Sequence, residues 1–373
     1  MGMAILDRFR VQTKTAAIEP DVAATNLAPL NNLNSLYTFI NTPISATYQE
    51  FISIPSASRA KDIIAQSIAS IPLVLRDRST GMRLDAPRVI NTPDPRLPGQ
   101  ATYAWLASDI LLYGFGYFQI TEQYSDTLRV RSVQRISPDR VGIETNADAT
   151  EITGYTIDGG YKLPDTGLGS LVVFYNPGDV GVLNRAGRTI RTGAELERAA
   201  MNYAREPIPS MVLKSNGTAL PADRIAKLLD QWGIARRNRT TAFLNADVTM
   251  EQVGFDPLKL QLVEARENIA TEISRAVGIP AYFTDSPSGS SMTYSNAVTA
   301  RQTLLDFSLI PIADAISQRL SMPDFTPSSQ VIRHDFDVYL RGSALERAQI
   351  YEIYNRIGVM TADEIMRKED MAL

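Results

Sequence analysis

The stretch SMTYSNAVTARQTLLDFSLIPIADAISQRL, residues 291–320, has the apolar periodicity of one long helix with Pro311 inside it. Proline removes an amide donor, and its ring clashes with the preceding helical turn, so we predict a bend in the helix at this residue. The sequence GIPAYFTDSPSGSSMTYSN, residues 278–296, leads into the helix and contains one charged residue, Asp285. Its glycines and serines favour a loop. The pattern therefore predicts a loop that opens into a bent helix.

Two amphipathic helices are predicted before this loop. The first begins at a capping box formed by Thr192 and Glu195 and ends before Pro207, and the second covers about residues 257–277. Short strands and one helix are predicted between them, in the segments SMVLKSNG (210–217), PADRIAKLLDQWGIARR (221–237), TTAFLN (240–245) and VTMEQVG (248–254). We therefore expect a small α/β insert held between two helices.

The N-terminal half predicts an α+β module. The first fifty residues have the composition of an extended arm. Helices are predicted for residues 58–70 and 102–114, and strands for residues 71–79, 117–123, 128–137, 152–163 and 170–177, with Asp158-Gly159 as a hairpin turn signal. Together these segments form a module of roughly 170 residues, the size of an ordinary domain.

The C-terminal part predicts one more strand and a helical pair. VIRHDFDVYL, residues 331–340, reads as the strand. A second capping box, Thr361 with Glu364, begins the last helix.

Composition limits what the chain can bind through bulk properties. Among 373 residues, 37 Lys and Arg stand against 41 Asp and Glu, which gives a formal net charge of -4. Such a chain has no global attraction for phosphates, so nucleic acid would not be held by overall charge. The absence of cysteine excludes disulfides, thiolate metal sites and cysteine nucleophiles.

A membrane location is not expected. The most membrane-like run, WLASDILLYGFGYFQI (105–120), is too short to span a bilayer comfortably and contains Asp109. The first residues, MGMAILDRFR, lack the apolar core of a signal peptide. We therefore expect synthesis and use in a cytoplasm.

The sequence contains few candidates for catalysis. No Gly-Lys pair, dinucleotide-binding glycine motif or Gly-x-Ser-x-Gly motif occurs, so we expect no enzyme activity and no cofactor. Asp335 and Asp337 are two residues apart on the predicted strand and could hold Mg²⁺ in a nuclease or phosphoesterase. A polar edge strand is the preferred interpretation, with His334 as a hydrogen-bonded structural residue.

Two segments are candidates for binding. Arg236, Arg237 and Arg239 in ARRNR could dock an acidic partner or DNA phosphate, but arginines at a helix C-terminus also complement the helix dipole, and both readings stay open. The loop between Thr284 and Thr293 lies between two long helices. Repeated around a ring, such loops would converge on the axis.

The order of these elements resembles the portal proteins of tailed double-stranded DNA bacteriophages of the long-tailed type. The strongest match is residues 264–320, which contain a helix, a loop, a Ser-Asn start and a long helix with a Leu-x-Pro motif in its middle. Residues 63–77, 94–120 and 207–217 also match, although Gly114-Phe115-Gly116-Tyr117 stands where the family often has a Gly-Asn-Ala-Tyr-like sequence. Residues 355–367 resemble the family's Gly-x-x-Thr-x-x-Glu-x-Arg ending.

The resemblance implies a multidomain α+β portal fold. Its parts would be a wing (1–188), a first stem helix (189–207), an α/β clip (208–256), a second stem helix (257–280), a tunnel loop (281–293), a wing spine helix and strand (294–343) and a short helical crown (344–373). Pro311 would bend the spine helix. The DNA-facing loop residues would be Asp285, Ser286, Ser288, Gly289, Ser290, Ser291 and Met292, and Arg236, Arg237 and Arg239 would dock a partner at the clip.

The implied function is a ring of identical subunits, expected to be a dodecamer, at one vertex of the capsid in the virion. It would pass double-stranded DNA during packaging and ejection. Its expected partners are the terminase packaging motor, the head-to-tail connector, and the major capsid and scaffold proteins, with assembly in the host cytoplasm. The alternatives are the Mg²⁺-dependent nuclease and a structural head-tail adaptor without a channel.

Overall fold

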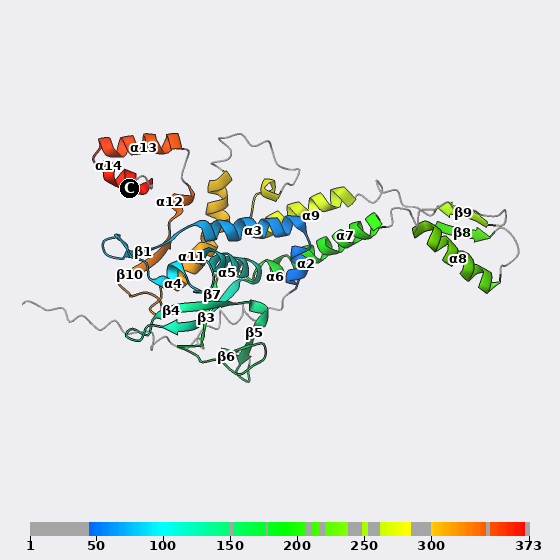
Figure 1. Cartoon of the computed structure of the whole chain (residues 1–373), viewed down its shortest axis with the longest axis horizontal. Helices are drawn as coiled ribbons and strands as arrows, with labels where there is room; N and C mark the ends of the chain where they lie inside the picture. The colour runs from blue at the N-terminus through cyan, green and yellow to red at the C-terminus, as the bar shows by residue number, and fades with distance from the viewer. Residues whose placement is uncertain are drawn as a thin grey trace, which may run out of the picture.

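The computed structural model describes residues 45–148, 152–176, 178–205, 211–215, 221–237, 248–252, 262–284, 300–340 and 344–369. Figure 1 shows a body of helices and antiparallel sheets from which two helices project toward a separate strand pair and helix. The mixture of helix and strand confirms the predicted α+β class. None of the described helices combines the length and apolar character required to span a membrane.

Helices α3 (Pro55–Ser70) and α5 (Gly99–Tyr113) form the centre of the body. Helical spacing places Ala57, Ala60, Ile64 and Ile68 of α3 in the core. Helix α5 is buried over most of its surface, so its pattern is apolar nearly all round. The short helices α2 (Tyr48–Ile52), capped by a Thr47–Glu50 capping box, and α4 (Arg88–Asn91) add to this layer.

A three-stranded antiparallel sheet in the order β4-β3-β7 lies against these helices (Figure 1). Its strands are β3 (Phe115–Gln123), β4 (Val130–Ile136) and β7 (Leu171–Tyr175). Alternation along each strand divides the side chains between two clusters: Phe118 and Phe174 face the helices, whereas Tyr117 and Val173 face a second, smaller core. Both faces of β7 are therefore buried, which explains its continuous apolar sequence.

The smaller core is closed by the hairpin of β5 (Val141–Thr145) and β6 (Ile152–Ile157), which follows the short helix η3 (Pro138–Arg140). The sequence pattern missed β5. The predicted turn does form, because Asp158 and Gly159 both have positive φ, but β6 pairs with β5 before the turn. After the turn, the described pairing to β6 is the hydrogen bond from Leu163 N–H to the Tyr155 carbonyl, at 2.8 Å.

A second sheet has the order β10-β1-β2 and brings together segments far apart in the chain. It consists of β1 (Leu73–Asp77), β2 (Arg83–Leu84) and β10 (Gln330–His334), and Leu73 is paired with His334 in an antiparallel register. The strand predicted for residues 331–340 is therefore wrong in its second half: the chain leaves the sheet at Asp335 and forms the short helix α12 (Phe336–Tyr339).

Helices α7 (Gly187–Arg205) and α9 (Leu262–Val277) lie side by side and lead away from the body (Figure 1). The capping box predicted at Thr192 is wrong, because α7 begins five residues earlier. Helix α7 follows α6 (Val182–Arg185) after the single residue Ala186, whose carbonyl accepts from the Ile190 N–H, so helical bonding is established before Thr192. Glu195 instead pairs with Arg198 inside the helix.

The insert at the far end of α7 and α9 contains β8 (Met211–Ser215), β9 (Val248–Gln252) and α8 (Ala222–Arg237). The two strands pair antiparallel, with Met211 opposite Gln252. This agrees with the predicted small α/β insert. The strand predicted for residues 240–245 lies outside the described residues.

The helix that contains Pro311 changes its winding just before the proline. Residues 300–304 are α-helical, Leu305–Leu309 form a π-helical turn, and α11 (Ile310–Leu320) follows with Pro311 in its first turn. The Ile310 N–H bonds to the Leu305 carbonyl, five residues back. A π-turn of this kind accommodates a proline inside a helix because it relieves the usual bonding to the previous turn. The bend itself stays a prediction.

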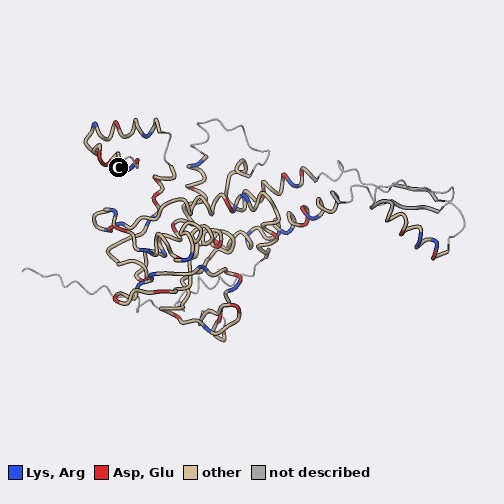
Figure 2. Tube along the Cα trace, in the orientation of Figure 1, with Lys and Arg blue, Asp and Glu red and all other residues tan. Residues whose placement is uncertain are grey.

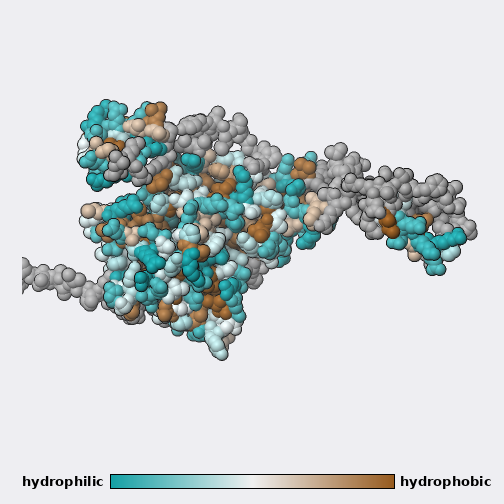
Figure 3. All heavy atoms as spheres, in the orientation of Figure 1, coloured by the Kyte–Doolittle hydropathy of each residue, from teal (hydrophilic) through white to brown (hydrophobic). Residues whose placement is uncertain are grey.

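The C-terminal pair consists of α13 (Ala344–Arg356) and α14 (Ala362–Lys368). The capping box of Thr361 and Glu364 is confirmed. Arg347 and Tyr351 of α13 both bond to the Glu369 carboxylate. Several large apolar side chains of this pair are exposed, and Figure 3 shows hydrophobic surface on it.

Candidate functional site

Most residues that the sequence singled out fall outside the described part of the chain. This applies to the loop residues Asp285, Ser286, Ser288, Gly289, Ser290, Ser291 and Met292, and to Arg239. Arg236 and Arg237 end α8, and their side chains are likewise not described. The structure does describe both ends of the 285–299 segment and the helix that contains Pro311. The described part of the candidate site therefore consists of the two segments that flank residues 285–299.

The end at which the chain enters the loop is fixed by three hydrogen bonds. The short helix η5 (Ala281–Thr284) ends at Thr284, whose hydroxyl is buried and lies 2.6 Å from the Ser274 hydroxyl of α9. The Thr284 hydroxyl also donates to the Ala281 carbonyl, at 2.8 Å. Arg59 of α3 donates from Nε to the Phe283 carbonyl, at 2.6 Å. This end is thus tied to two helices of the body.

The helix that follows the loop is anchored further along its length. Ala300, Leu304 and Leu305 are buried, and the Ser308 hydroxyl, eight residues after Ala300, donates to the Gly278 carbonyl just after α9. The chain entering the 285–299 segment and the helix leaving it are therefore both bonded near the C-terminal end of α9. The sequence predicted a loop between two helices, and the fold adds these two contacts near one helix end.

The π-turn next to this attachment presents an aromatic side chain to solvent. Phe307 is 76 % exposed, whereas its neighbours Ser308 and Leu309 are buried. Pro311 is also exposed, so one side of the irregular turn faces solvent while the other faces the core. A π-turn commonly marks a position where a helix has been adapted to a function.

The proposed pair of metal ligands does not have the geometry that a metal site needs. Asp335 follows β10 and its N–H bonds to the Pro72 carbonyl, whereas Asp337 lies in α12, so the two residues do not share one strand face. Among the residues that the structure describes, no group of three or more His, Asp or Glu side chains could hold a metal ion. The Mg²⁺-dependent nuclease is therefore not favoured.

His334 is a structural residue, as the sequence suggested. It is 8 % exposed, stacks on Phe336 with ring centroids 6.0 Å apart, and hydrogen-bonds to the Ala313 backbone. Its Nδ1 is buried without a hydrogen-bond partner in the described structure, so Nε2 is the donor. Burial lowers the pKa of His334 to about 4, and the imidazole is neutral near pH 7.

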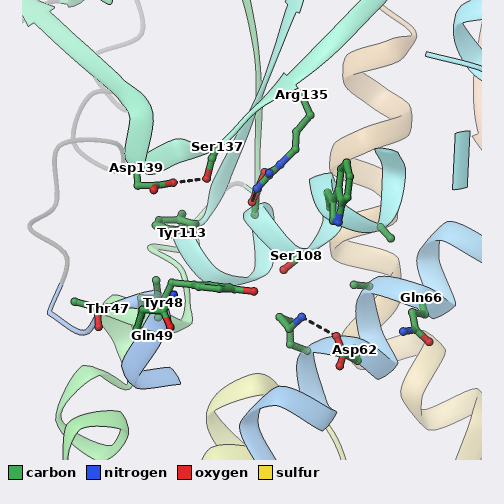
Figure 4. A pocket seen from close by; sticks show the side chains of 16 residues that line it. Thr47, Tyr48, Gln49, Asp62, Gln66, Ser108, Tyr113, Arg135, Ser137 and Asp139 are labelled. Atoms are coloured by element: carbon green, nitrogen blue, oxygen red, sulfur yellow. Dashed lines mark hydrogen bonds and ion pairs between the residues drawn. The ribbon is translucent and has the colours of Figure 1, made fainter. Parts of the chain in front are cut away.

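A cavity of about 770 Å³ beside α5 contains several charged side chains (Figure 4). Arg135 of β4 points toward α5 and forms a two-pronged ion pair with Asp109, with N–O distances of 2.6 and 2.8 Å. Its guanidinium also lies 5.9 Å from the Trp105 ring centroid. Burial raises the pKa of Asp109 to about 6, against the lowering effect of Arg135.

This ion pair joins the central helix to the sheet, and the other acids of the cavity also have bonded partners. Asp109 gives both oxygens to Arg135, and Asp62 and Asp139 are bonded to Lys61 and Ser137. Sequence reasoning took Asp109 only as a mark against a membrane span. A single acidic residue within an apolar helix was the signal for a buried partner.

The comparisons with known proteins agree with this arrangement. The probable portal protein of Streptomyces phage phiC31 is 21 % identical over an alignment of 368 residues, and the match covers 88 % of this chain and 76 % of that protein. A portal protein of the HK97 family from Corynebacterium diphtheriae is 21 % identical, with a TM-score of 0.62 over 79 % of this chain and 97 % of that one.

The neck of a native gene transfer agent particle, computed with C12 symmetry, contains a chain 17 % identical to this one. Its TM-score is 0.53, and the match covers 89 % of this chain and 97 % of that chain. At such identities these likenesses show the fold. The family model described as phage portal protein matches residues 55–370, nearly all of the described structure, so the chain belongs to the phage portal protein family.

Proposed function

We propose that this chain forms a ring at one vertex of a phage capsid, and that double-stranded DNA passes through the ring during packaging and ejection. Membership of the portal family over residues 55–370 is the observation that carries this proposal. The resemblance to a chain in a neck computed with C12 symmetry supports twelve subunits. We place the ring in the virion and its assembly in the host cytoplasm.

The parts of the fold receive their proposed roles from the shape in Figure 1. The body of α3, α5 and the sheets is the wing, α7 and α9 are the stem, and β8, α8 and β9 are the clip. Helices α13 and α14 are the crown. The segment after Thr284 is the tunnel loop, and its fixed ends support this role because a loop that touches moving DNA must be held at its base.

The chemistry of the proposed conduit favours sliding over binding. Residues 285–292 include one charged residue, Asp285, and the whole chain has a net charge of -4. Each arginine or lysine that neutralised a phosphate would add affinity and slow the passage of DNA. A nearly neutral lining therefore suits a channel through which DNA moves.

We assign the proposed partners to two parts of the subunit, the clip and the wing. The clip, with Arg236 and Arg237 at the end of α8, would dock the terminase motor during filling and the head-to-tail connector afterwards. The outer surface of the wing would contact capsid and scaffold proteins. We propose no enzyme activity, no cofactor and no membrane partner for this chain.

Mass measurement and imaging of the purified chain test the proposal directly. We expect a ring, of about twelve copies by the symmetry of the related neck, with a central hole in views down its axis. A chain that stays monomeric at high concentration, also with scaffold or capsid protein present, would contradict the ring. Assemblies without a central hole would favour an adaptor, and Mg²⁺-dependent DNA cleavage that is lost in Asp337→Ala would favour the nuclease.

A further inference from the structure

The two stem helices are joined by an internal contact that leaves their other faces free. Helices α7 and α9 run antiparallel, since Arg185, just before α7, donates to the Ala276 carbonyl near the end of α9. Glu197 and Arg266 bond across the pair at 2.8 Å. Gly193 lies so close to Ile269 that an added Cβ would be 2.9 Å from that side chain. These contacts define the inner face of each helix.

The remaining charges on the described side chains of the two helices form two opposite sets. The α7 flank carries three arginines and one glutamate: Arg188, Arg191, Glu195 and Arg198. The α9 flank carries three glutamates and one arginine: Glu264, Glu267, Glu272 and Arg275. Figure 2 shows charged residues along both helices as they leave the body. One helix is thus basic and the other acidic, apart from the internal pair.

Helical spacing places these flanks on opposite sides of the helix pair. On α7, the α7 flank lies about half a turn from Gly193 and Glu197, which face α9. On α9, Glu264 and Glu267 are likewise displaced from Arg266 and Ile269, which face α7. Seven of the eight flank residues are exposed and Glu272 is half-buried, as expected for surfaces that the subunit itself does not cover.

We propose that, in the ring, the α7 flank of each subunit packs against the α9 flank of the next subunit. This inference rests on the proposed ring. A subunit with two different, complementary surfaces on opposite sides forms head-to-tail contacts, and these close into a ring when the rotation allows. The opposite charges of the two flanks identify the occupant of each as a second copy of this chain.

Rotational symmetry also indicates which residues meet. Rotation about the ring axis does not change the height of a residue along that axis. If the stem helices run close to the axis direction, a residue in one subunit therefore faces the residues at the same height in the next subunit. The Glu197–Arg266 contact sets the levels, and the helices run in opposite directions. Arg198 is therefore level with Glu264 of the next subunit, and Arg191 is level with its Glu272.

The pairs that these residues make within one subunit do not oppose such an exchange. Arg198 bonds to Glu195, and Arg275 bonds to Glu272, within their own helices, and Arg191 lies 4.0 Å from the carboxylate of Glu50 in α2. All three arginines are exposed, Arg191 at 59 %, Arg198 at 61 % and Arg275 at 70 %, and exposed ion pairs contribute little. A neighbouring helix can take over these partners without breaking a buried contact.

Charge reversal with compensation tests the inference on the full-length chain. Arg198→Glu and Glu264→Arg should each raise the subunit concentration at half assembly, measured by sedimentation at low salt, by about three- to tenfold. The double variant Arg198→Glu/Glu264→Arg should return it to the wild-type value, and high salt should shrink all differences. Arg83→Glu, an exposed arginine on β2, is the matched control and should behave as wild type.

The outcomes separate this inference from the proposed function. If the wild type forms no ring at any concentration, the proposed function fails and the interface falls with it. If the wild type forms rings but the single reversals assemble normally, or the double variant does not recover, the interface alone is overturned. Rings of Arg198→Glu that assemble normally but no longer pass DNA would instead place the α7 flank on the channel.

Cross-linking provides an independent measurement, because the chain contains no cysteine. Arg198→Cys combined with Glu264→Cys, treated with a short bis-maleimide, should give a ladder of multimers up to the full ring on a denaturing gel. Either single variant should give no ladder. A product that stops at the dimer would indicate a symmetric contact, and no product from the double variant in assembled rings would place the flanks apart; both would overturn the proposal.

Discussion

Gly114 ends α5 with a left-handed backbone, φ +83°, and turns the chain directly into β3. An added Cβ would lie 2.5 Å from the Asp179 carbonyl oxygen and 3.0 Å from the Gly181 nitrogen. A Cβ added at Gly181 would likewise lie 2.4 Å from the Leu112 carbonyl oxygen. The two glycines therefore allow the start of α6, and hence the stem, to pack against the end of α5.

Replacing Gly114 with alanine should cost about 2–4 kcal/mol of stability, since it adds left-handed strain and a clash with backbone atoms. Gly81→Ala is the matched control: Gly81 also has positive φ, +72°, but has open space around it. Gly81→Ala should therefore cost only about 1 kcal/mol of stability. Thermal and urea unfolding of the two variants measure the difference, and equal losses would contradict the role of the close approach.

His334 should make the stability of the body depend on pH below neutrality. Its pKa is lowered to about 4 in the folded chain, from an ordinary value near 6.5, because it is buried. Between these values the unfolded chain binds the proton and the folded chain does not, so stability is full above pH 6.5 and is lost as the pH falls toward 4. The loss from this residue should reach about 2–3 kcal/mol.

The comparison of wild type with His334→Gln isolates this effect, because His334 is the one histidine in the sequence. The variant is expected to be less stable near pH 7 but to lose less stability on acidification. In the wild type, the imidazole proton resonances of His334 should titrate near pH 4. A titration near 6.5 would mean that the ring is solvated and that the assigned burial is wrong.

Residue-level features were predictable from sequence where the signal is local. The helix predicted for residues 102–114 does end at Gly114, and Thr361 with Glu364 form the predicted capping box. The role of Gly181 was not predictable, because it depends on a contact with the end of α5 that only the fold creates. For the same reason the Asp109–Arg135 pair was missed.

At the scale of elements, the ion pair between α5 and β4 connects the main helical layer to the sheet. Arg135→Ala should cost about 3 kcal/mol, because it leaves the Asp109 carboxylate buried without its partner. The pKa of Asp109 is already raised to about 6. Above that pH the buried carboxylate is charged and destabilises the folded chain, whereas below it protonation removes the charge and the penalty. The loss should therefore be larger at pH 8 than at pH 5.

Arg131→Ala is the control for this prediction. Arg131 lies on the same strand, is 47 % exposed and is 3.8 Å from Glu122, so its loss should change stability by less than about 1 kcal/mol. Denaturation of both variants at the two pH values measures the contrast. A pH-independent loss in Arg135→Ala would show that Asp109 stays ionised in the variant.

Most elements followed from periodicity, and the errors occur where a tertiary contact outweighs the local pattern. The predicted helices and strands around α3, β1, α5, β3 and β7 are all present. Thr192 and Glu195 match a capping box, but α7 already begins at Gly187, so both residues lie inside the helix. Residues 331–340 have a strand-like pattern, but pairing with β1 ends at His334.

At the scale of the whole molecule, the proposed channel depends on a loop that does not hold DNA. Ser288→Arg with Ser290→Arg should leave ring formation intact and reduce packaging or ejection, because the added guanidinium groups bind phosphates. The phage titre and the packaged DNA length, compared with a Ser288→Ala/Ser290→Ala variant, measure the effect. An unchanged titre would contradict the assignment of this loop to the channel.

The proposed clip makes a separate prediction. Arg236→Glu with Arg237→Glu should weaken docking of the motor or the connector, since two positive charges at the end of α8 become negative. Pull-down of the motor and counts of filled, tailed particles measure this, with Lys227→Glu on the same helix as a control. Normal particles from the double variant would rule out this docking role.

The architecture was predictable to the level of a family because the order of elements is distinctive, although no single motif is. The loop's position in an assembly was not predictable from periodicity, because it depends on neighbouring copies that a single sequence does not display. Composition nevertheless limited the possibilities: with a net charge of -4 and no cysteine, the chain pointed away from metal chemistry and from bulk DNA binding.

The way in which the 285–299 segment is fastened has a mechanical consequence. A load applied to that segment would reach the rest of the subunit through Thr284 and Ser308, and both are bonded at the end of α9. There, Ile273 and Val277 are buried in the main core, so the load passes into that core. If DNA moves past the segment as proposed, its friction would be resisted by the core of the body rather than by the segment alone.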